Sequence, residues 1–246
     1  LQVNAVHRTV SGQWADLFFL APRLLNSYHN LSTTLGLGNE GRILQLNLTR
    51  PYPKLSSRLA YGASIKHSVS IQRLYTEQAL SARYHDYLLG GNIWIAPSWG
   101  LKHKIRPTLR VDISERNYTS TSSFTYTPQN RRRVLFSVGI TLWQPHYEKA
   151  SYVQQLGPIE DLQMGSWLTT RVGLSHQALG SDRTYPFAQI QLEPRWHLQP
   201  QMYTYLSLSG SMRFKHNGYY NLSTRLALLN YIQWRQIHTL ALRLAW

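Results

Sequence analysis

Histidine and serine residues that lie close together in the sequence could do chemistry, because a serine activated by an imidazole can attack an ester bond. Three pairs have a suitable spacing, namely His29 with Ser32, His67 with Ser68, and His216 with Ser223. His67 and Ser68 would face opposite sides of a regular strand. The chain has 10 His, so some lie near a serine by chance. We therefore expect structural histidines and no catalytic residue, with a Ser-His lipid hydrolase as the less favoured alternative.

Glu160 and Asp161 are the only adjacent acidic pair, and they precede an expected strand. Paired carboxylates can bind a divalent cation, but the sequence identifies no further oxygen ligands. An unpartnered buried charge is costly, so we expect Glu160 or Asp161 within about 4 Å of a basic side chain, with Arg171 as the candidate. The chain has no cysteine, which excludes thiolate sites. No metal and no cofactor is predicted.

The chain is strongly basic, with 26 Lys+Arg against 11 Asp+Glu and a formal net charge of +15. Such a charge can indicate nucleic-acid binding. The basic residues are nevertheless scattered singly, apart from Arg131-Arg132-Arg133, and no DNA-binding or RNA-binding signature occurs. We expect no nucleic-acid partner. Basic rims facing anionic lipid headgroups, or a cationic lumen, fit the distribution better.

Period-2 alternation of apolar and polar residues recurs along most of the chain, and it predicts strands with two different faces. It is clear in Ile43–Thr49, in Val134–Leu142, between Leu206 and Lys215, and in the last segment, from Thr239 to Trp246. Alternation alone does not distinguish a soluble sandwich from a barrel. Segments such as Leu55–Tyr75 exceed the usual strand length and suit the crossing of a bilayer.

No window approaches 18 consecutive apolar residues, so no transmembrane helix is predicted. A membrane protein without such helices must be a closed barrel, because every backbone amide in the hydrocarbon needs a partner. Charged residues make up only 15% and aromatic residues 12% of the chain, which suits a membrane protein better than a soluble domain. The sequence therefore predicts an all-β fold, an antiparallel transmembrane β-barrel of about 12 strands, as a single domain over residues 1–246.

Tyrosine and tryptophan cluster near segment ends, where aromatic rings typically anchor a barrel at the two membrane interfaces. Ordinary core aromatics are the alternative. The residues concerned are Tyr84, Tyr87, Trp94, Trp99, Tyr219, Tyr220, Tyr231 and Trp234.

Turn signals separate the expected strands, and the Ser/Thr-rich stretch Thr119–Asn130 is the expected long loop. The turns are predicted at Gly38–Gly41, Arg50–Pro53, Gly90–Asn92, Thr127–Asn130, Leu179–Asp182 and His216–Gly218.

The two ends of the chain leave alternatives open. Leu240–Trp246 resembles the C-terminal signal by which outer-membrane barrels reach their assembly machinery, and the chain could equally have been cut there. The sequence that begins at Leu1 shows no recognisable secretory signal. Such a signal was either removed or never included.

Several segments resemble the barrel region of the bacterial surface-antigen superfamily, the relatives of BamA and TamA. The matching pieces are Leu35–Gly38, Leu48–Tyr52, Ser57–Gly62 and Glu160–Gly165. The Arg-Gly-Phe/Tyr motif and the preceding POTRA domains of that superfamily do not occur in this sequence. A partial barrel would explain both departures.

The resemblance implies a barrel in the bacterial outer membrane that takes part in outer-membrane biogenesis or moves protein or lipid across that membrane. The expected partners are outer-membrane lipid and lipopolysaccharide, and other envelope proteins. A passive pore that favours anions and a structural subunit of an envelope complex are the further alternatives.

Overall fold

The structure is a computed structural model that describes residues 2–8, 12–76, 79–120, 128–153, 159–199, 201–215, 218–234 and 238–245. Strands account for 78% of it and helix for 3%, so the predicted all-β class is confirmed. Within these ranges, no helix is both long enough and apolar enough to cross a membrane.

Strands of very different lengths follow one another, with two short 3-10 helices between them. The elements are β1 (Gln2–Arg8), β2 (Gly12–Ala21), η1 (Leu24–Asn26), β3 (Asn30–Gly38), β4 (Gly41–Arg50), β5 (Leu59–Thr76), β6 (Ala79–Pro97), β7 (Lys104–Ser120), β8 (Arg131–Trp143), β9 (Tyr147–Ala150), β10 (Glu160–Gln163), β11 (Trp167–Ser175), η2 (Gln177–Leu179), β12 (Tyr185–Glu193), β13 (Arg195–Gln199), β14 (Met202–Lys215), β15 (Gly218–Trp234) and β16 (His238–Ala245).

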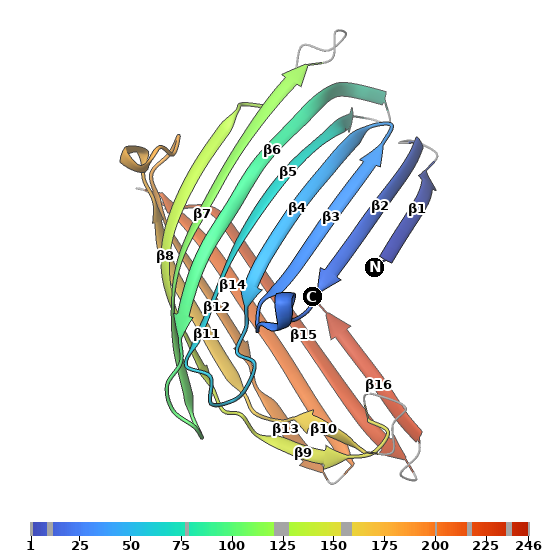
Figure 1. Cartoon of the computed structure of the whole chain (residues 1–246), viewed down its shortest axis with the longest axis vertical. Coiled ribbons are helices and arrows are strands. Elements are labelled where there is room, and N and C mark those ends of the chain that lie inside the picture. Colours follow the sequence, from blue (N-terminus) through green and yellow to red (C-terminus); the bar gives the residue numbers. More distant parts are fainter. Residues whose placement is uncertain are drawn as a thin grey trace. The chain divides into compact units, whose positions relative to one another are not determined.

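Most strands join one large antiparallel sheet, in which each strand lies beside its nearest neighbours in the sequence (Figure 1). The order is β1-β2-β3-β4-β5-β6-β7-β8-β11-β12-β14-β15-β16, and β13 pairs with β14. This path has thirteen strands, one more than the favoured twelve. β9 and β10 form a separate two-stranded sheet. In the described part of the chain, β1 pairs only with β2 and β16 only with β15, and no ladder closes the sheet into a barrel.

Contacts within the chain gather into two compact units. Unit 1 contains residues 1–95, 110–136 and 175–184, and unit 2 contains residues 96–109, 137–174 and 185–246. The division does not follow the chain, because three separate segments make up each unit. Each unit carries its own polar face and its own apolar face.

Strands β4 and β5 show how alternation builds two faces in unit 1. Leu46 and Leu48 are 37% and 42% exposed, whereas Asn47 between them is half-buried. The antiparallel register places Leu46 opposite Ile65 and Asn47 opposite Ser64. Residues directly opposite each other share a face, so one face is apolar and exposed and the other is polar.

Unit 2 repeats this arrangement in β12 and β14. Ile190 is 48% exposed on the apolar face. On the other face Gln189 lies opposite Ser211, and Gln191 lies opposite Ser209. The predicted alternation therefore builds a polar face in both units.

The turn predicted at Gly90–Asn92 is wrong, because these residues lie within β6. A Cβ on Gly91 would lie 2.7 Å from the carbonyl oxygen of Ser64, so the neighbouring strand approaches too closely for a side chain. Asn92 continues the strand and donates a hydrogen bond to Ser64 Oγ. Glycine here marks close packing between strands and not a reversal of the chain.

Other predicted turns do lie between strands. Gly38–Gly41 links β3 to β4, Arg50–Pro53 follows β4, and Leu179–Asp182 lies between β11 and β12, where Gly180 has a φ of +88°. The loop predicted over Thr119–Asn130 begins too early, since β7 continues to Ser120. Residues 121–127, 216–217 and 246 lie outside the described residues, and the predictions that fall on them concern Thr127, His216, Asn217 and Trp246.

Several of the expected interface aromatics lie on the polar faces, Trp94 and Tyr231 among them. Trp94 lies on the polar face of unit 1. Its ring is so close to Gly62 that a Cβ added to this glycine would lie 2.8 Å from Trp94 Nε1. Tyr231 packs against a buried cluster of unit 2. Trp99 and Trp234, by contrast, are 56% and 69% exposed. The position of an aromatic residue near a strand end is therefore not enough to assign its face.

Candidate functional site on the polar face

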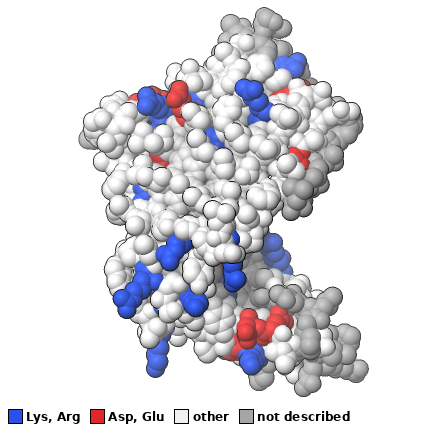
Figure 2. Space-filling view, in the orientation of Figure 1, with Lys and Arg blue, Asp and Glu red and all other residues white. Residues whose placement is uncertain are grey.

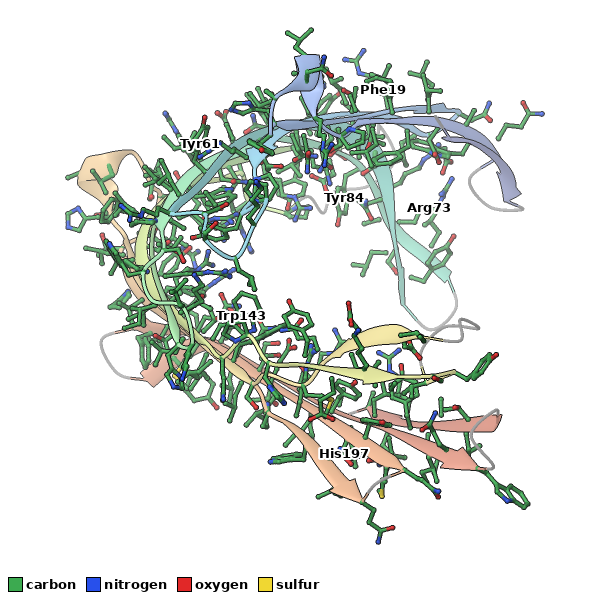
Figure 3. The ribbon with its side chains drawn as sticks, turned by 60° about the horizontal axis from the view of Figure 1, so that its bottom comes forward. Phe19, Tyr61, Arg73, Tyr84, Trp143 and His197 are labelled. Carbon is green, nitrogen blue, oxygen red and sulfur yellow. The ribbon has the colours of Figure 1, made fainter. Side chains whose placement is uncertain are left out.

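A row of polar side chains crosses β3, β4, β5 and β6 on one face of unit 1. Asn47 donates to Ser32 Oγ over 3.1 Å, and Asn92 donates to Ser64 Oγ. Phe19 and Tyr84 lie on opposite sides of the ribbon, as expected for residues of the apolar and the polar face (Figure 3). Partly buried polar groups thus satisfy one another along the row.

Carboxylates neutralise the arginines on the polar face of unit 1. Asp86 is only 7% exposed, and its Oδ1 lies 3.2 Å from Nε of Arg116. Arg110 donates to Asp112 Oδ1 from Nε over 2.9 Å and from a terminal nitrogen over 2.7 Å. These contacts are charge-assisted, which makes them stronger than neutral hydrogen bonds.

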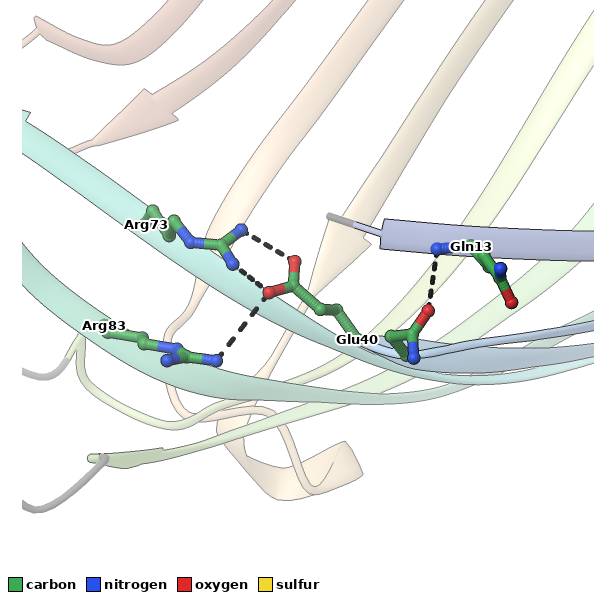
Figure 4. Close-up of polar contacts among 5 residues, drawn as sticks. Gln13, Glu40, Arg73 and Arg83 are labelled. Carbon is green, nitrogen blue, oxygen red and sulfur yellow. Dashed lines mark hydrogen bonds and ion pairs between the residues drawn. The ribbon is translucent and has the colours of Figure 1, made fainter. Parts of the chain in front are cut away.

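A second charged cluster lies at the β3–β4 turn of unit 1 (Figure 4). Glu40 accepts hydrogen bonds from Arg73 through both carboxylate oxygens and lies 3.7 Å from a terminal nitrogen of Arg83. The backbone N–H of Gln13 donates to the Asn39 side chain over 2.6 Å. The turn therefore connects the beginning of β2 with β5 and β6.

Several arginines of unit 2 stack on aromatic rings, as Arg50 does on Tyr61 in unit 1 at 5.9 Å. A guanidinium within about 6 Å of a ring centroid is attracted by the ring's quadrupole. The distances from Cζ to the centroid are 4.5 Å for Arg106 over Trp143, 5.0 Å for Arg171 over Phe187, 4.6 Å for Arg195 over Trp167, 5.0 Å for Arg195 over Tyr205 and 5.7 Å for Arg213 over Tyr185.

Two of these stacks share strand β12. Phe187, the ring under Arg171, lies directly opposite Arg213 in the β12–β14 ladder. Arg213 in turn stacks on Tyr185, two residues before Phe187. Arginines and rings therefore alternate across β11, β12 and β14. With the residues that the structure describes, the Arg213 guanidinium forms no hydrogen bond and no ion pair.

The β9–β10 hairpin packs on the aromatic end of the same face. Leu162 is 1% exposed and belongs to a buried cluster with Val153, Met164 and Tyr203. The Tyr205 hydroxyl donates to Met164 Sδ over 3.6 Å. Further contacts come from β13, where Arg195 donates to the carbonyl of Gln163 over 2.7 Å, and from β15, where Gln233 donates to the carbonyl of Ser151.

Glu148 of the hairpin holds two imidazoles. Its Oε1 lies 3.2 Å from His146 Nε2, and its Oε2 lies 3.1 Å from His197 Nδ1. The His197 ring (labelled in Figure 3) stacks on Tyr203 at 4.6 Å. Among the described residues, no group of three His, Cys, Asp or Glu side chains is placed to hold a metal ion. The geometry supports a structural link between the hairpin and β13.

The three residues predicted to form an ion-pair set all lie in unit 2. Glu160 begins β10, and its carboxylate accepts a hydrogen bond from the backbone N–H of Val153. Asp161 lies opposite Lys149 in the β9–β10 ladder, and Arg171 lies in β11 over Phe187. The ion pair between Glu160 or Asp161 and Arg171 stays a prediction.

The serine and histidine pairs have other arrangements. His29 Nδ1 lies 2.8 Å from Ser27 Oγ and its Nε2 lies 2.8 Å from the Tyr61 hydroxyl, while Ser32 accepts from Asn47. Ser27 Oγ donates to the carbonyl of Leu24 over 2.6 Å, so this contact fixes the loop around η1.

Of the remaining two pairs, the structure describes both residues only of His67 with Ser68. His67 lies opposite Leu44, and Ser68 lies opposite Ile43, so the two side chains face opposite sides as expected. His216 lies outside the described residues. Ser223 lies opposite Ser211 on the polar face.

Sequence reasoning missed the arginine and aromatic stacks and the Glu40 cluster. The alternation does assign Arg213 to the polar set of its strand. It does not give the register that places Arg213 opposite Phe187. Pairing of Arg73 with Glu40 depends on contacts 33 residues apart, for which no local signal exists.

No protein-family model matches this chain, and no curated protein matches it either. The resemblance of the sequence to surface-antigen barrels therefore stays a prediction.

Proposed function

We propose that the chain forms all or part of a transmembrane β-barrel in the outer membrane of a Gram-negative bacterium, with its apolar faces toward lipid and its polar faces toward a water-filled interior. The observation that carries this proposal is the exposure of aliphatic side chains at alternate positions of long strands. Leu46, Ile65 and Ile93 are 37%, 53% and 62% exposed on the apolar face of unit 1. A soluble monomer rarely exposes so many contiguous apolar residues.

The lengths of the strands support the same proposal. β5 has 18 residues, β6 has 19 and β7 has 17. About 9 to 11 tilted residues cross the hydrocarbon, so these strands have enough length to cross and to extend beyond it. The apolar face of unit 1 also carries a groove of about 630 Å³, whose lining includes Ala63, Gly91 and Ile113. Acyl chains would fill such a hollow in a bilayer.

Translocation along the polar face is the role that we assign to this barrel. By the resemblance in its sequence, the cargo is a protein or a lipid, and the role belongs to outer-membrane biogenesis. A second candidate, passage of small anions, is favoured by the arginines on the polar face of unit 2. Lysine and arginine are also more prominent than aspartate and glutamate on the side of the molecule in Figure 2.

Membrane insertion is tested with single cysteines, since the natural chain has none. Leu46→Cys and Asn47→Cys are adjacent but lie on opposite faces, so they form a matched pair. In lipid vesicles, a fluorophore on residue 46 should be quenched by nitroxide-labelled acyl chains. A water-soluble thiol reagent should modify residue 47 faster than residue 46. Equal behaviour at both positions, or a protein that stays soluble and monomeric without detergent, would contradict insertion.

Translocation is tested after insertion, by planar-bilayer conductance of the purified chain. An open passage should give discrete conductance steps, with anions permeating better than cations. Insertion without any conductance would remove the anion pore and leave translocation of a larger cargo.

A further inference from the structure

The groove on the apolar face of unit 1 interrupts a surface of large aliphatic side chains. Leu89 and Ile93 are exposed two residues before and after Gly91 in β6, so all three positions share one face of the strand. Ala63 of β5, opposite Leu48, is a second small residue on this face. Large side chains around small ones leave a hollow of about 630 Å³, which is within the range of about 300 to 1,000 Å³ usual for small-molecule sites.

The backbone keeps this hollow open. A Cβ on Gly91 would lie 2.7 Å from the carbonyl oxygen of Ser64, and a Cβ on Gly90 would lie 3.4 Å from the carbonyl oxygen of Ile113. Strand β6 therefore lies close to both of its neighbours at this point, and no side chain at position 91 could fill the space. The groove is thus built into the pairing of the strands and does not depend on one side-chain rotamer.

Two side chains of opposite charge also line the groove, namely Glu115 of β7 and Arg132 of β8. Glu115 lies two residues after Ile113 and shares its face, and Arg132 is exposed near the beginning of β8. These parts of β7 and β8 are adjacent, because the backbone N–H of Tyr118 donates to the Asn130 side chain over 2.8 Å. Charges on a lipid-facing strand are costly at the bilayer midplane and tolerated near the interface, so this is the headgroup end of the groove.

Both charges have room for a ligand. One carboxylate oxygen of Glu115 accepts a hydrogen bond from the Asn117 side chain over 3.0 Å. The Arg132 guanidinium lies beside the turn after η2, where a Cβ on Gly180 would lie 3.7 Å from its Cζ. Asp182, close to that turn, accepts a hydrogen bond from the backbone N–H of Arg132 and not from its guanidinium. Neither Glu115 nor Arg132 forms an ion pair with a residue that the structure describes.

We propose that the groove binds one molecule of a phospholipid whose headgroup carries both a phosphate and a primary ammonium, as phosphatidylethanolamine does. An acyl chain lies along the hollow over Ala63 and Gly91. The phosphate accepts hydrogen bonds from Arg132, whose planar fork matches its oxygens, and the ammonium donates to Glu115. The inference deepens the proposed function and rests on it in one respect, namely that the apolar face of unit 1 meets lipid.

The experiment counts the lipids that stay bound to the full chain, folded in a neutral detergent, by native mass spectrometry. Short-chain phosphatidylethanolamine, phosphatidylcholine and phosphatidylglycerol are offered at equal concentrations. One phosphatidylethanolamine should be retained per chain, about tenfold more tightly than phosphatidylglycerol, which has no ammonium to pair with the carboxylate. Phosphatidylcholine should fall between the two, because its quaternary ammonium keeps the charge and has no N–H to donate.

Three variants separate the parts of the site. Arg132→Gln should weaken retention of phosphatidylethanolamine roughly tenfold, because a charge-assisted hydrogen bond to the phosphate is lost. Glu115→Gln should abolish the preference for phosphatidylethanolamine over phosphatidylglycerol. Ala63→Leu should weaken retention of all three lipids, since the larger side chain fills the hollow and leaves both charges in place.

The matched controls lie in unit 1 and do not line the groove. Arg42→Gln removes an exposed charge opposite Leu37 and Val69, and Ala15→Leu enlarges an exposed side chain that is also opposite Leu37. Both should leave lipid retention unchanged. Circular dichroism checks that every variant keeps the strand content of the wild type. Equal retention of phosphatidylethanolamine and phosphatidylglycerol by the wild type would overturn the inference, and so would equal retention by the wild type and a folded Arg132→Gln.

The outcome is separable from that of the proposed function. Correct labelling of residues 46 and 47 without lipid retention would remove the site and keep the barrel. Selective retention in detergent by a chain whose residues 46 and 47 label alike would keep the site and remove the barrel.

Discussion

The polar faces of the two units hold their arginines by different means. In unit 1 the partners are mainly carboxylates, as in Asp86 with Arg116 and Asp112 with Arg110. In unit 2 the partners are mainly aromatic rings, as in Arg213 over Tyr185. A carboxylate cancels the charge, whereas a ring positions the guanidinium and leaves its charge in place. The two units therefore differ in the kind of side chain that holds their arginines.

The largest expected effect comes from removing a carboxylate of unit 1. Asp86 is 7% exposed, so Asp86→Ala leaves Arg116 without its partner beside a buried strand. Arg116 is itself 48% exposed at its side chain and regains some water, so we expect a loss of about 2 kcal/mol in the free energy of unfolding. Urea unfolding in detergent measures it. The exposed Asp161→Ala is the control and should leave stability unchanged.

A smaller effect is expected from removing a ring in unit 2. Trp167→Leu takes away the ring that lies 4.6 Å from Arg195, and the loss should be about 1 kcal/mol in the same unfolding assay. Trp167→Phe keeps a ring and should recover part of the loss. If Trp167→Leu destabilises the chain more than Asp86→Ala, then rings and not carboxylates are the stronger partners, and the comparison fails.

The smallest expected effect is the change in the coupling free energy of the two kinds of pair when the salt concentration rises. Double-mutant cycles give the coupling between Asp86 and Arg116, and between Trp167 and Arg195. Between 0.1 and 1 M salt the first coupling should fall by roughly half, because Arg116 is half exposed and salt screens it. The second should stay nearly constant, since Arg195 is 16% exposed at its side chain. An equal fall in both would show that the environments do not differ electrostatically.

Much of the sheet was predictable from residues that alternate locally. Leu46 and Asn47 illustrate this, because the period of two separates their faces whatever strand lies beside them. Glu160 was correctly expected at the start of a strand, but that strand pairs with β9 in a separate sheet. Strand character is a local property, whereas the choice of partner strand is not.

The site was much less predictable, for two physical reasons. Register between strands depends on contacts far apart in the chain, and Phe187 gives no sign in the sequence that it lies opposite Arg213. Glycine is also ambiguous. The Gly90-Gly91-Asn92 sequence is typical of a turn, yet Gly91 lies within a strand and allows the backbone of Ser64 to approach closely. The register and the role of such a glycine can be interpreted only when the neighbouring strand is known.

The end strands of the large sheet have a consequence for how the chain behaves in water. Each of β1 and β16 pairs along one edge only in the described part of the chain, which leaves a row of backbone donors and acceptors on the other edge. Such an edge accepts any extended peptide that meets it. In water, adding a foreign strand competes with completing the native pairing, so the time that these edges stay uncovered decides how much of the chain is lost to aggregation.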